Sequence, residues 1–318
     1  MKKQYLQSLG STSLKVSPVG FGTYRFDAQL GHKDLLKQAF LSGINLVDTS
    51  CNYGHGAVET AVGEVINTLD YDAELSRDSL VVVSKAGFLE GQTFTKYNHQ
   101  FSTMAQLGPH VAHCIDPDFL ELQLNQSLMR LNLKKLNVFL LHNPESYFLD
   151  ASNAKKDIAE QHDEFYQSID KAFEFLEQKV ASGHCDYYGI SSNRFALNQQ
   201  LPDSVALSTI LERAKKLNAK HFKVIQCPFN VLESDLACSE NGQASVMQLA
   251  QQSGIGVLGN RPLNALWNNQ LERLVDVQHY DCLSRLEIED LIGAGIDFEA
   301  TLLESLDQPE LESLKQYL

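Results

Sequence analysis

Residues 117–142 read PDFLELQLNQSLMRLNLKKLNVFLLH, and this stretch joins two different hydrophobic patterns. In its first part apolar residues recur every three or four positions, which predicts an amphipathic helix over Pro117–Leu131 that starts at Asp116 or Pro117. The stretch ends with Val138–His142, an apolar run typical of a buried strand. A helix followed directly by a strand is the repeating unit of α/β folds.

The same alternation of short apolar runs with longer amphipathic stretches continues along the chain. Further helices are predicted over Asp163–Ser182 and Ser245–Ser253, and Gly254 after the second can adopt a left-handed cap. Strands that alternate with helices form either an open doubly wound sheet or a closed barrel. The predicted strands are Val19–Gly22, Leu46–Asp48, Leu80–Ser84, Val138–His142, Tyr187–Ser191, Val224–Cys227 and Gly256–Leu258.

Two features of these strands favour a closed (β/α)8 TIM-type barrel over the open sheet. The Gly-x-Gly-x-x-Gly fingerprint of open dinucleotide-binding sheets does not follow the first strand. Polar candidates instead follow the ends of several different strands, which a barrel gathers around one mouth. A length of 318 residues fits one such domain over the whole chain.

Two segments stand outside this repeat. Residues Tyr5–Ser17 alternate about the turn signal Gly10–Ser11, which predicts an N-terminal β-hairpin placed to plug the barrel floor. Phe88–Ile115 is long and lacks strong periodicity, so we expect a loop at the barrel mouth.

Composition and charge argue against several classes of function. Hydrophobic residues make up 43% of the chain and charged residues 21%, as in ordinary soluble globular proteins. The net charge of −14 disfavours binding to nucleic acid or to anionic membranes. No apolar run approaches the roughly 20 residues that span a bilayer. Because its start does not resemble a secretion signal, we expect the chain in the cytoplasm.

Cysteine and histidine spacing predicts no metal site. The six cysteines form no C-x-x-C pair, so we interpret them as small buried or incidental residues of a protein in a reducing compartment. His99, His110 and His113 share the long segment before Pro117, but they lack a regular ligand spacing. We therefore expect these three histidines at the surface.

Four residues of different chemistry follow strands in the first half of the chain. Asp48 ends one strand and Tyr53 follows it by five residues, Lys85 ends VVVSK, and His142 ends VFLLH. Taken singly, each has a structural explanation as a helix cap, a packing residue or a solvated strand end. Together they can converge on one cleft at the barrel mouth.

This set of side chains suits the reduction of a carbonyl group by hydride. A tyrosine is a poor acid near pH 7, but the ammonium group of Lys85 would favour the phenolate of Tyr53 and ease proton donation. Asp48 would hold that ammonium group in place, and a neutral His142 would orient the carbonyl oxygen.

A series of motifs in order makes the chain similar to the aldo-keto reductases. The motifs are LGSTSLKVSPVGFGTYRF, GINLVDTSCNYGHGAVETAVGEVI, VVVSKAGF, SLMRLNLKKLNVFLLHNPE, YYGISSNRF, VIQCPFNVLE and GIGVLGNRPLNAL, and they cover about residues 4–266. The resemblance implies a (β/α)8 barrel that binds NAD(P)H across its C-terminal mouth. It also implies that Tyr53 is the proton donor, that Lys85 and Asp48 tune it, and that His142 orients the substrate.

The resemblance assigns the nicotinamide carboxamide to the GISSN segment, through Ser191, Ser192 or Asn193, and to Gln226. Without the resemblance, GISSN would be a strand end followed by a turn.

Three further residues are candidates for contact with the substrate. Tyr24 and Phe88 follow strand ends, where they form either an apolar wall of the pocket or part of the core. Asn143 comes directly after His142 and can line the same pocket.

The chain departs from the family near its C-terminal end. Many members have an aromatic residue followed by Ser after the seventh strand, whereas this chain has Asn260 and Arg261. The stacking ring is replaced, while the guanidinium of Arg261 offers a phosphate contact. After Leu266 no eighth strand with a phosphate-binding segment is recognisable.

Residues 267–318 therefore form an atypical C-terminal segment. Residues 281–318 carry ten acidic and two basic residues, and their spaced leucines predict one or two solvated amphipathic helices or a partner-binding helix. Such an acidic segment cannot replace a basic grip on a 2′-phosphate.

The first functional hypothesis is an oxidoreductase that uses NADP or NAD to interconvert an aldehyde or ketone, sugars included, with its alcohol. The alternative is a cofactor-binding sensor or scaffold that keeps the barrel and turns over slowly. A metal-dependent barrel hydrolase ranks third, because the chain lacks a convincing ligand cluster. The expected partner is a small carbonyl or alcohol substrate, and neither nucleic acid nor membrane is expected.

Overall fold

The computed structural model describes residues 6–27, 31–98, 100–101, 104–150, 155–195, 203–238, 244–267 and 270–275. The chain divides into two compact units, Met1–Glu272 and Arg273–Leu318. The sheet and the candidate site lie in the first unit. A single domain over residues 1–318 stays a prediction, because most of the second unit lies outside the described residues.

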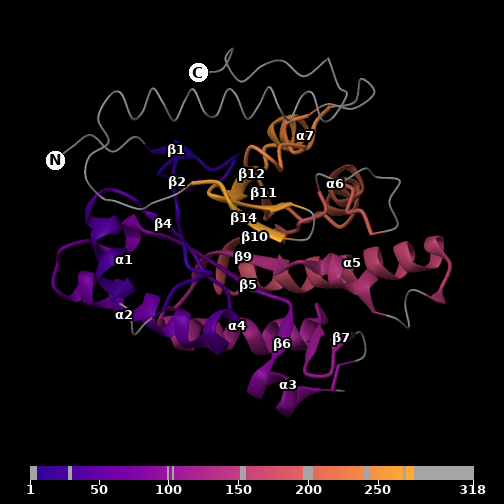
Figure 1. Cartoon of the computed structure of the whole chain (residues 1–318), viewed down its shortest axis with the longest axis horizontal. Coiled ribbons are helices and arrows are strands. Elements are labelled where there is room, and N and C mark those ends of the chain that lie inside the picture. Colours follow the sequence, from indigo (N-terminus) through magenta and orange to yellow (C-terminus); the bar gives the residue numbers. More distant parts are fainter. Residues whose placement is uncertain are drawn as a thin grey trace. The chain divides into compact units, whose positions relative to one another are not determined.

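Seven parallel strands form the main sheet of the first unit, in the order β12-β11-β10-β9-β5-β4-β3 (Figure 1). This order follows the chain from one edge to the other, without the reversal that defines a doubly wound sheet. The fold is therefore of the (β/α)8 barrel type. All seven predicted strands are confirmed, as β3 (Phe21–Gly22), β4 (Leu46–Asp48), β5 (Val81–Ala86), β9 (Leu136–His142), β10 (Cys185–Ser191), β11 (Phe222–Pro228) and β12 (Gly256–Asn260).

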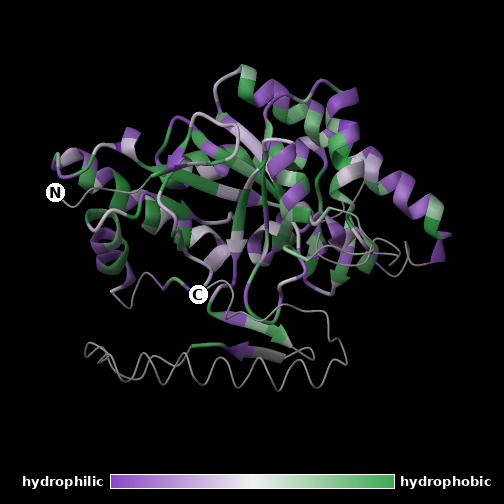
Figure 2. Ribbon diagram, turned by 90° about the horizontal axis from the view of Figure 1, so that it is seen from above, coloured by the Kyte–Doolittle hydropathy of each residue, from purple (hydrophilic) through white to green (hydrophobic). Residues whose placement is uncertain are grey.

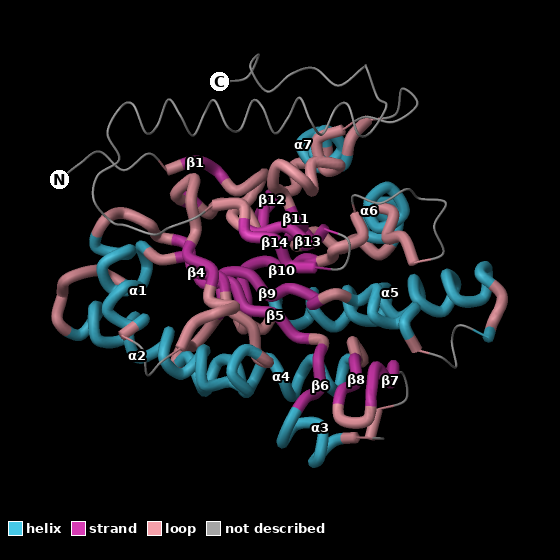
Figure 3. Tube along the Cα trace, in the orientation of Figure 1, coloured by secondary structure: helices cyan, strands magenta, loops and turns pink. Residues whose placement is uncertain are grey.

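Helices connect consecutive strands and flank the sheet (Figure 3). The predicted helix over Pro117–Leu131 is confirmed as α4, and the Asp116 carboxylate caps it by accepting a hydrogen bond from the backbone N–H of Asp118. Ser245 and Gln248 form a capping box at the start of α7 (Val246–Gln252). The helices are α1 (His32–Leu41), α2 (Ala57–Tyr71), α4 (Pro117–Leu131), α5 (Ile158–Ala181), α6 (Leu207–Lys216) and α7 (Val246–Gln252).

Side chains of the strands alternate between two apolar clusters. Val81 and Val83 belong to an inner cluster with residues of β4, β9 and β11, whereas Val82, between them, packs in the larger cluster with the helices. Figure 2 shows the hydrophobic strands at the centre and helices with mixed faces around them. Because the side-chain period of a strand is two, Lys85 continues the inward-facing series of Val81 and Val83.

The predicted N-terminal hairpin is confirmed, and it packs against the barrel interior. Strands β1 (Gln7–Ser8) and β2 (Lys15–Val16) pair antiparallel. Leu9 and Val16 are buried in the inner apolar cluster. Gly10 has a φ of 56°, and a Cβ there would lie 2.3 Å from the backbone nitrogen of Gly256 at the start of β12. The hairpin therefore lies at the N-terminal end of the barrel strands.

The segment Phe88–Ile115, predicted as a loop at the barrel mouth, follows the carboxyl end of β5 and has secondary structure of its own. This segment contains β6 (Phe88–Glu90), α3 (Gly91–Tyr97), β7 (Ala105–Gly108) and β8 (Val111–His113), and the three strands form a sheet of their own. Strands of three or four residues are too short to show a clear period in the sequence. Phe119, from α4, completes their small core, so a contact between distant parts of the chain supports them.

The described chain continues from β12 into a two-stranded sheet of β13 (Asn264–Trp267) and β14 (Gln270–Arg273). Within the described residues no eighth parallel strand joins the main sheet, in line with the atypical last unit expected from the sequence. The helices predicted over residues 281–318 lie outside the described residues.

The structure can be compared with two expectations from composition, on the cysteines and on membrane-spanning segments. Cys51, Cys114, Cys185 and Cys227 are buried, which confirms their interpretation as small buried residues. None of the helices in the described ranges is long and apolar enough to cross a bilayer.

Candidate active site

The predicted site residues occupy inward-facing positions at the carboxyl ends of adjacent strands. Asp48 ends β4, Lys85 lies near the end of β5, and His142 ends β9. Ser191, at the end of β10, pairs in register with both His142 and Gln226. The alternation that fills the barrel with apolar side chains thus places this polar layer directly above them.

Lys85 and Asp48 form a buried ion pair at the centre of this layer. Lys85 Nζ lies 2.6 Å from Asp48 Oδ2, and the lysine is 0% exposed. Tyr53 comes from the short 3₁₀ helix η1 (Tyr53–Gly56) that follows β4, and Lys85 Nζ lies 5.1 Å from the centre of its ring. The predicted convergence of these three residues is therefore present.

The pKa values in this cluster follow from burial and from the neighbouring charges. Burial lowers the pKa of Lys85, but the Asp48 carboxylate and the Tyr53 hydroxyl outweigh it and leave that pKa above its ordinary value. Burial raises the pKa of Tyr53, and the positive charge of Lys85 opposes this effect without cancelling it. Tyr53 is thus protonated at neutral pH, and Lys85 eases the loss of its proton in the direction predicted.

His142 completes the set as a neutral imidazole. Burial is the main cause that holds the pKa of His142 well below its usual value, and the positive charge of Lys85 is the second cause. Its ring meets Tyr53 and Phe88 edge-on, with ring centres 6.0 Å and 5.1 Å away. Its Nδ1 atom lies 3.0 Å from the hydroxyl of Ser50.

The expected surface position of His113 is wrong. This side chain is 2% exposed, and its Nε2 lies 2.8 Å from the backbone oxygen of His142. Burial lowers the pKa of His113 to about 4, so the ring is a neutral hydrogen-bond partner that supports His142. His110 is exposed as predicted, and His99 lies outside the described residues.

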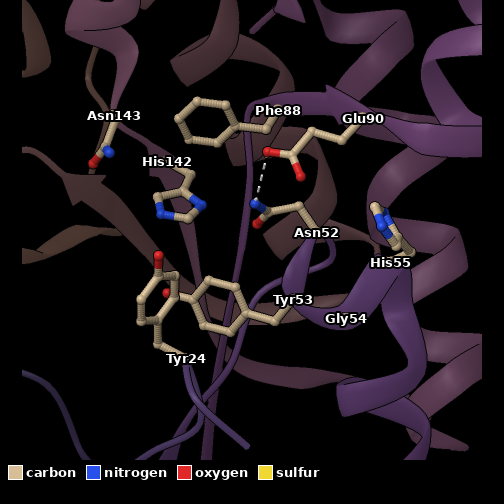
Figure 4. Close-up of a pocket in the computed structure, with 9 residues that line it drawn as sticks. All are labelled: Tyr24, Asn52, Tyr53, Gly54, His55, Phe88, Glu90, His142 and Asn143. Atoms are coloured by element: carbon tan, nitrogen blue, oxygen red, sulfur yellow. Dashed lines mark hydrogen bonds between the residues drawn. The ribbon is translucent and has the colours of Figure 1, made fainter. Parts of the chain in front are cut away.

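A pocket of about 400 Å³ opens beside Tyr53 and His142 (Figure 4). All three predicted substrate contacts line it: Tyr24, Phe88 and Asn143. Tyr24 is 72% exposed, so it belongs to the wall of the pocket rather than to the core. The remaining lining residues are Asn52, Gly54, His55 and Glu90.

Gln226 connects the ion pair to the GISSN segment. Its Nε2 donates to Asp48 Oδ1 at 2.8 Å, and its Oε1 accepts from the hydroxyl of Ser191 at 2.9 Å. The backbone N–H of Ser192 donates to the backbone oxygen of Gln226. A hydrogen-bonded chain therefore runs from Lys85 to the predicted nicotinamide contacts.

Glu145 supports the turn that follows Ser191. It is 6% exposed, and its Oε1 accepts a hydrogen bond from the backbone N–H of Asn193 at 2.9 Å. Its second oxygen, Oε2, is buried without a hydrogen-bond partner among the described residues. Burial raises the pKa of Glu145 to about 7.

A second buried ion pair lies on the outer side of β5. Glu59, from α2, accepts from Arg130 Nε at 2.7 Å and from the hydroxyl of Ser84 at 2.6 Å. A Cβ on Gly56 would lie 2.8 Å from Arg130 Cδ, so the turn that carries Tyr53 rests closely on the arginine. The pair braces both the turn after β4 and the strand that carries Lys85.

The sequence pattern that defines the Aldo/keto reductase family matches residues 18–273. The chain belongs to the aldo/keto reductase family. The match begins just before β3 and ends at the last residue of β14, so it includes the strands that carry the site.

Two known proteins show what this aldo/keto reductase resembles in sequence. It is 31% identical over 142 residues to a Schizosaccharomyces pombe protein named as a voltage-gated potassium channel subunit beta. This alignment covers 43% of this chain and 36% of the relative. It is 31% identical over 156 residues to the L-galactose dehydrogenase of Arabidopsis thaliana. This second alignment covers 47% of this chain and 41% of the relative. The chain thus matches less than half of the length of either relative.

Among solved structures, the aldo-keto reductase from Bacillus halodurans in its holo form superposes with a TM-score of 0.53 and 20% identity. The superposition covers 79% of this chain and 64% of the other. This similarity supports the barrel fold.

Asn260 and Arg261, which replace the aromatic residue and serine found in many family members, have distinctive contacts in the structure. Arg261 Nη2 lies 2.5 Å from Glu233 Oε1, so its guanidinium is already paired. Asn260 Oδ1 and Arg261 Nε are buried without hydrogen-bond partners among the described residues. An unpaired acceptor and an unpaired donor at the end of β12 fit a polar ligand such as a dinucleotide.

Sequence reasoning missed Ser50, Asn52 and Glu90. Ser50 and Asn52 lie in the turn between Asp48 and Tyr53, where proximity to those residues was the available signal. Glu90 lies two residues after Phe88 on β6, so strand alternation would have placed it beside Phe88 if this short strand had been recognised. Glu59 and Arg130 carried no local signal, because 71 positions separate them.

Proposed function

We propose that this protein is an oxidoreductase that uses NADP or NAD to interconvert an aldehyde or ketone with its alcohol. The observation that carries this proposal is that Tyr53 and His142 line one pocket, while the buried Lys85, paired with Asp48, lies next to the Tyr53 ring. Family membership and the dehydrogenase among its relatives support the same class of reaction.

Tyr53 is the proton donor in this proposal. At neutral pH its hydroxyl keeps its proton, because burial raises its pKa. When the proton moves to the carbonyl oxygen, the phenolate left behind lies beside the ammonium group of Lys85, which stabilises it. Asp48 holds Lys85 in this position through the 2.6 Å ion pair.

The walls of the pocket position the reacting carbon. His142 is neutral and lies between Tyr53 and Phe88, so it can contact the substrate without competing for the proton of Tyr53. Tyr24 and Phe88 offer aromatic surface, and Asn143 offers an amide. This arrangement holds a small carbonyl compound against the proton donor.

Among the residues proposed to hold the dinucleotide, Ser191 pairs in register with His142, which lines this pocket. Ser191, Ser192, Asn193 and Gln226 would hold the nicotinamide end, and Asn260 and Arg261 would hold a phosphate. The unpaired donor Arg261 Nε supports the phosphate contact. When bound, the reduced dinucleotide supplies the hydride, and both NADP and NAD remain compatible with these residues.

The second candidate function is a cofactor-binding sensor or scaffold with little turnover. The relative named as a channel subunit favours it, because that name is not the name of an enzyme. The complete set of Tyr53, Lys85, Asp48 and His142 favours the enzyme instead.

Steady-state nicotinamide absorbance with both reduced cofactors tests the proposal across a panel of aldehydes, ketones and sugars. We expect at least one carbonyl compound to oxidise the cofactor at a rate that saturates with substrate. A parallel titration of cofactor fluorescence separates the candidates: binding without turnover across the panel, in both directions of the reaction, would support the sensor. Absence of both binding and turnover would contradict both.

A further inference from the structure

The charged groups around the pocket beside Tyr53 and His142 leave one negative charge without a counter-charge. Glu90 is the only Asp or Glu among the described residues that line the pocket, and no lysine or arginine is among them. The nearby Lys85 is 0% exposed, and its charge is already paired with Asp48. His142 is neutral, because burial and the charge of Lys85 hold its pKa well below its usual value.

The carboxylate of Glu90 is directed to the pocket by the register of β6. Leu89 is buried in the small core under this strand, so strand alternation turns Phe88 and Glu90 to the other side, where both line the pocket. Figure 4 shows the carboxylate turned toward Asn52, whose Nδ2 donates to Glu90 Oε1 at 3.4 Å. Although His55 also lines the pocket, no ion pair in the described part of the chain includes Glu90.

Three aromatic rings line the same pocket, from Tyr24, Tyr53 and Phe88. The centres of the Tyr24 and Tyr53 rings lie 5.3 Å apart, with 71° between the ring planes. Tyr24 is 72% exposed, so much of its ring is open to a ligand. The face of an aromatic ring carries the negative part of its charge distribution and attracts cations, and quaternary ammonium ligands are bound by groups of such rings.

We propose that Glu90 and the aromatic rings around it make this pocket selective for carbonyl compounds that carry an ammonium group. This inference rests on the proposed oxidoreductase function and names its substrate class. The carbonyl group of the substrate lies at the hydroxyl of Tyr53, and its ammonium group lies at the carboxylate of Glu90. The ammonium group binds the substrate and takes no part in the transfer of hydride or proton. A carboxylate on the substrate would be repelled by Glu90.

Choline and 3,3-dimethylbutan-1-ol test the cation site without any turnover. The two alcohols have the same shape, and they differ in a quaternary nitrogen that replaces a quaternary carbon. Titrations followed by ¹H NMR measure the affinity of the purified protein for each alcohol. Choline should bind about tenfold more tightly, a difference of about 1.4 kcal/mol. Choline binding that is undetectable, or no tighter than that of the neutral alcohol, would overturn the proposal.

The Glu90→Gln variant removes the charge and keeps the size of the side chain. It should lose the preference for choline, while its affinity for 3,3-dimethylbutan-1-ol should stay close to that of the wild type. The matched control is Glu212→Gln, at an exposed carboxylate on the outer helix α6, which should keep the preference. An unchanged preference in a folded Glu90→Gln variant would contradict the proposal.

The Tyr24→Leu variant tests the contribution of the rings. Tyr24 is largely exposed, so its replacement should leave the fold intact. Choline affinity should fall about two- to fivefold, the value of a cation–π contact at an exposed site, and the neutral alcohol should respond less. An equal loss for both alcohols would show that the Tyr24 ring acts only as apolar surface.

Kinetics on the corresponding aldehydes connect the cation site to turnover. The ratio of kcat/KM for betaine aldehyde over 3,3-dimethylbutanal should be about tenfold lower in Glu90→Gln than in the wild type or in Glu212→Gln. Hydration of each aldehyde in water is the same for every variant, so it cancels from this comparison. An equal ratio in all three proteins would refute the selection of substrates by Glu90. If no carbonyl compound is turned over, the oxidoreductase proposal fails, while the choline titrations still decide the cation site.

Discussion

Lys85 Nζ lies 2.6 Å from Asp48 Oδ2, and the other oxygen of Asp48 accepts a hydrogen bond from Gln226 Nε2 at 2.8 Å. Both oxygens of this carboxylate are therefore engaged by donors, so Asp48 is poorly suited to act as a base. Its position makes it a fixed counter-charge for a lysine that is otherwise buried. The ion pair in turn keeps a positive charge next to Tyr53, and the first two predictions depend on that charge.

Replacement of Tyr53 by Phe should lower turnover on the order of 10²–10⁴-fold, the range typical of general acid–base catalysis. The ring and its edge-on contacts are retained, so cofactor affinity should stay close to that of the wild type. Single-turnover kinetics and cofactor fluorescence measure the two effects separately. Turnover at the wild-type rate would show that another group donates the proton.

Lys85→Met should raise the kinetic pKa assigned to Tyr53, because the positive charge that favours the phenolate is removed. Turnover should fall on the order of 10²-fold, as expected when one preorganised electrostatic contact is lost. The pH profile of kcat/KM measures the shift, and thermal unfolding shows whether the variant folds. A folded variant with an unshifted profile would mean that Lys85 does not act on Tyr53.

Removal of Arg130 as Arg130→Met should destabilise the fold by about 3–5 kcal/mol, because Glu59 would keep a buried charge without its partner. Glu59 is 0% exposed and also holds Ser84, next to Lys85. The control is Lys33→Met, which breaks an exposed pair with Glu64 and should cost about 0–1 kcal/mol. Urea denaturation measures both, and equal losses would mean that burial does not strengthen the inner pair.

Glu145 should make stability depend on pH in a direction opposite to that of an ordinary paired carboxylate. Its pKa is raised in the folded protein from 4.5 to about 7, so its contribution is fully present below pH 4.5 and is lost as the pH rises through 7. Measured against Glu145→Gln, the wild type should lose about 3 kcal/mol of relative stability across that interval.

Urea denaturation of both proteins at several pH values between 4.5 and 7.5 tests this prediction. The comparison cancels the contribution of His113, whose lowered pKa acts in the opposite direction in both proteins. A constant difference between the two proteins would show that Glu145 titrates as it does in the unfolded chain.

Arg261 forms an ion pair with Glu233, so its guanidinium should contribute to cofactor binding only when this ion pair opens. Arg261→Ala should weaken binding of NADPH by about one to two decades, the value of one charge-assisted hydrogen bond. Glu233→Gln should strengthen it, because the guanidinium is released. Preference for NADPH over NADH should be small in the wild type. Tight and strongly NADPH-selective binding that survives Arg261→Ala would contradict this account of the C-terminal end of the barrel.

The order of strands and helices could be predicted from the sequence because local hydrophobic patterns encode it. The helix over Pro117–Leu131 agrees with its predicted bounds, since Asp116 caps it and its apolar residues repeat at helical spacing. The convergence of Asp48, Lys85 and His142 was predictable for the same reason: each ends a strand, and parallel strands of a barrel end at one mouth.

Other features depend on contacts between residues far apart in the chain, so the sequence pattern does not predict them. The strands around Phe88 are too short to carry a period, and their core is completed by Phe119. Burial makes His113 a neutral inner residue, and burial is the largest cause that raises the pKa of Tyr53 despite its lysine neighbour.

The βα repeat and the residue types at the strand ends follow from local sequence, because side-chain periodicity is a local property. The partners of those residues were decided by the fold, which brings Gln226 to Asp48 across 178 positions and Arg130 to Glu59 across 71. Charge, tautomer and proton affinity depend on such partners and on exclusion of water. These properties are absent from any local stretch of sequence and arise only when the barrel closes over the side chains.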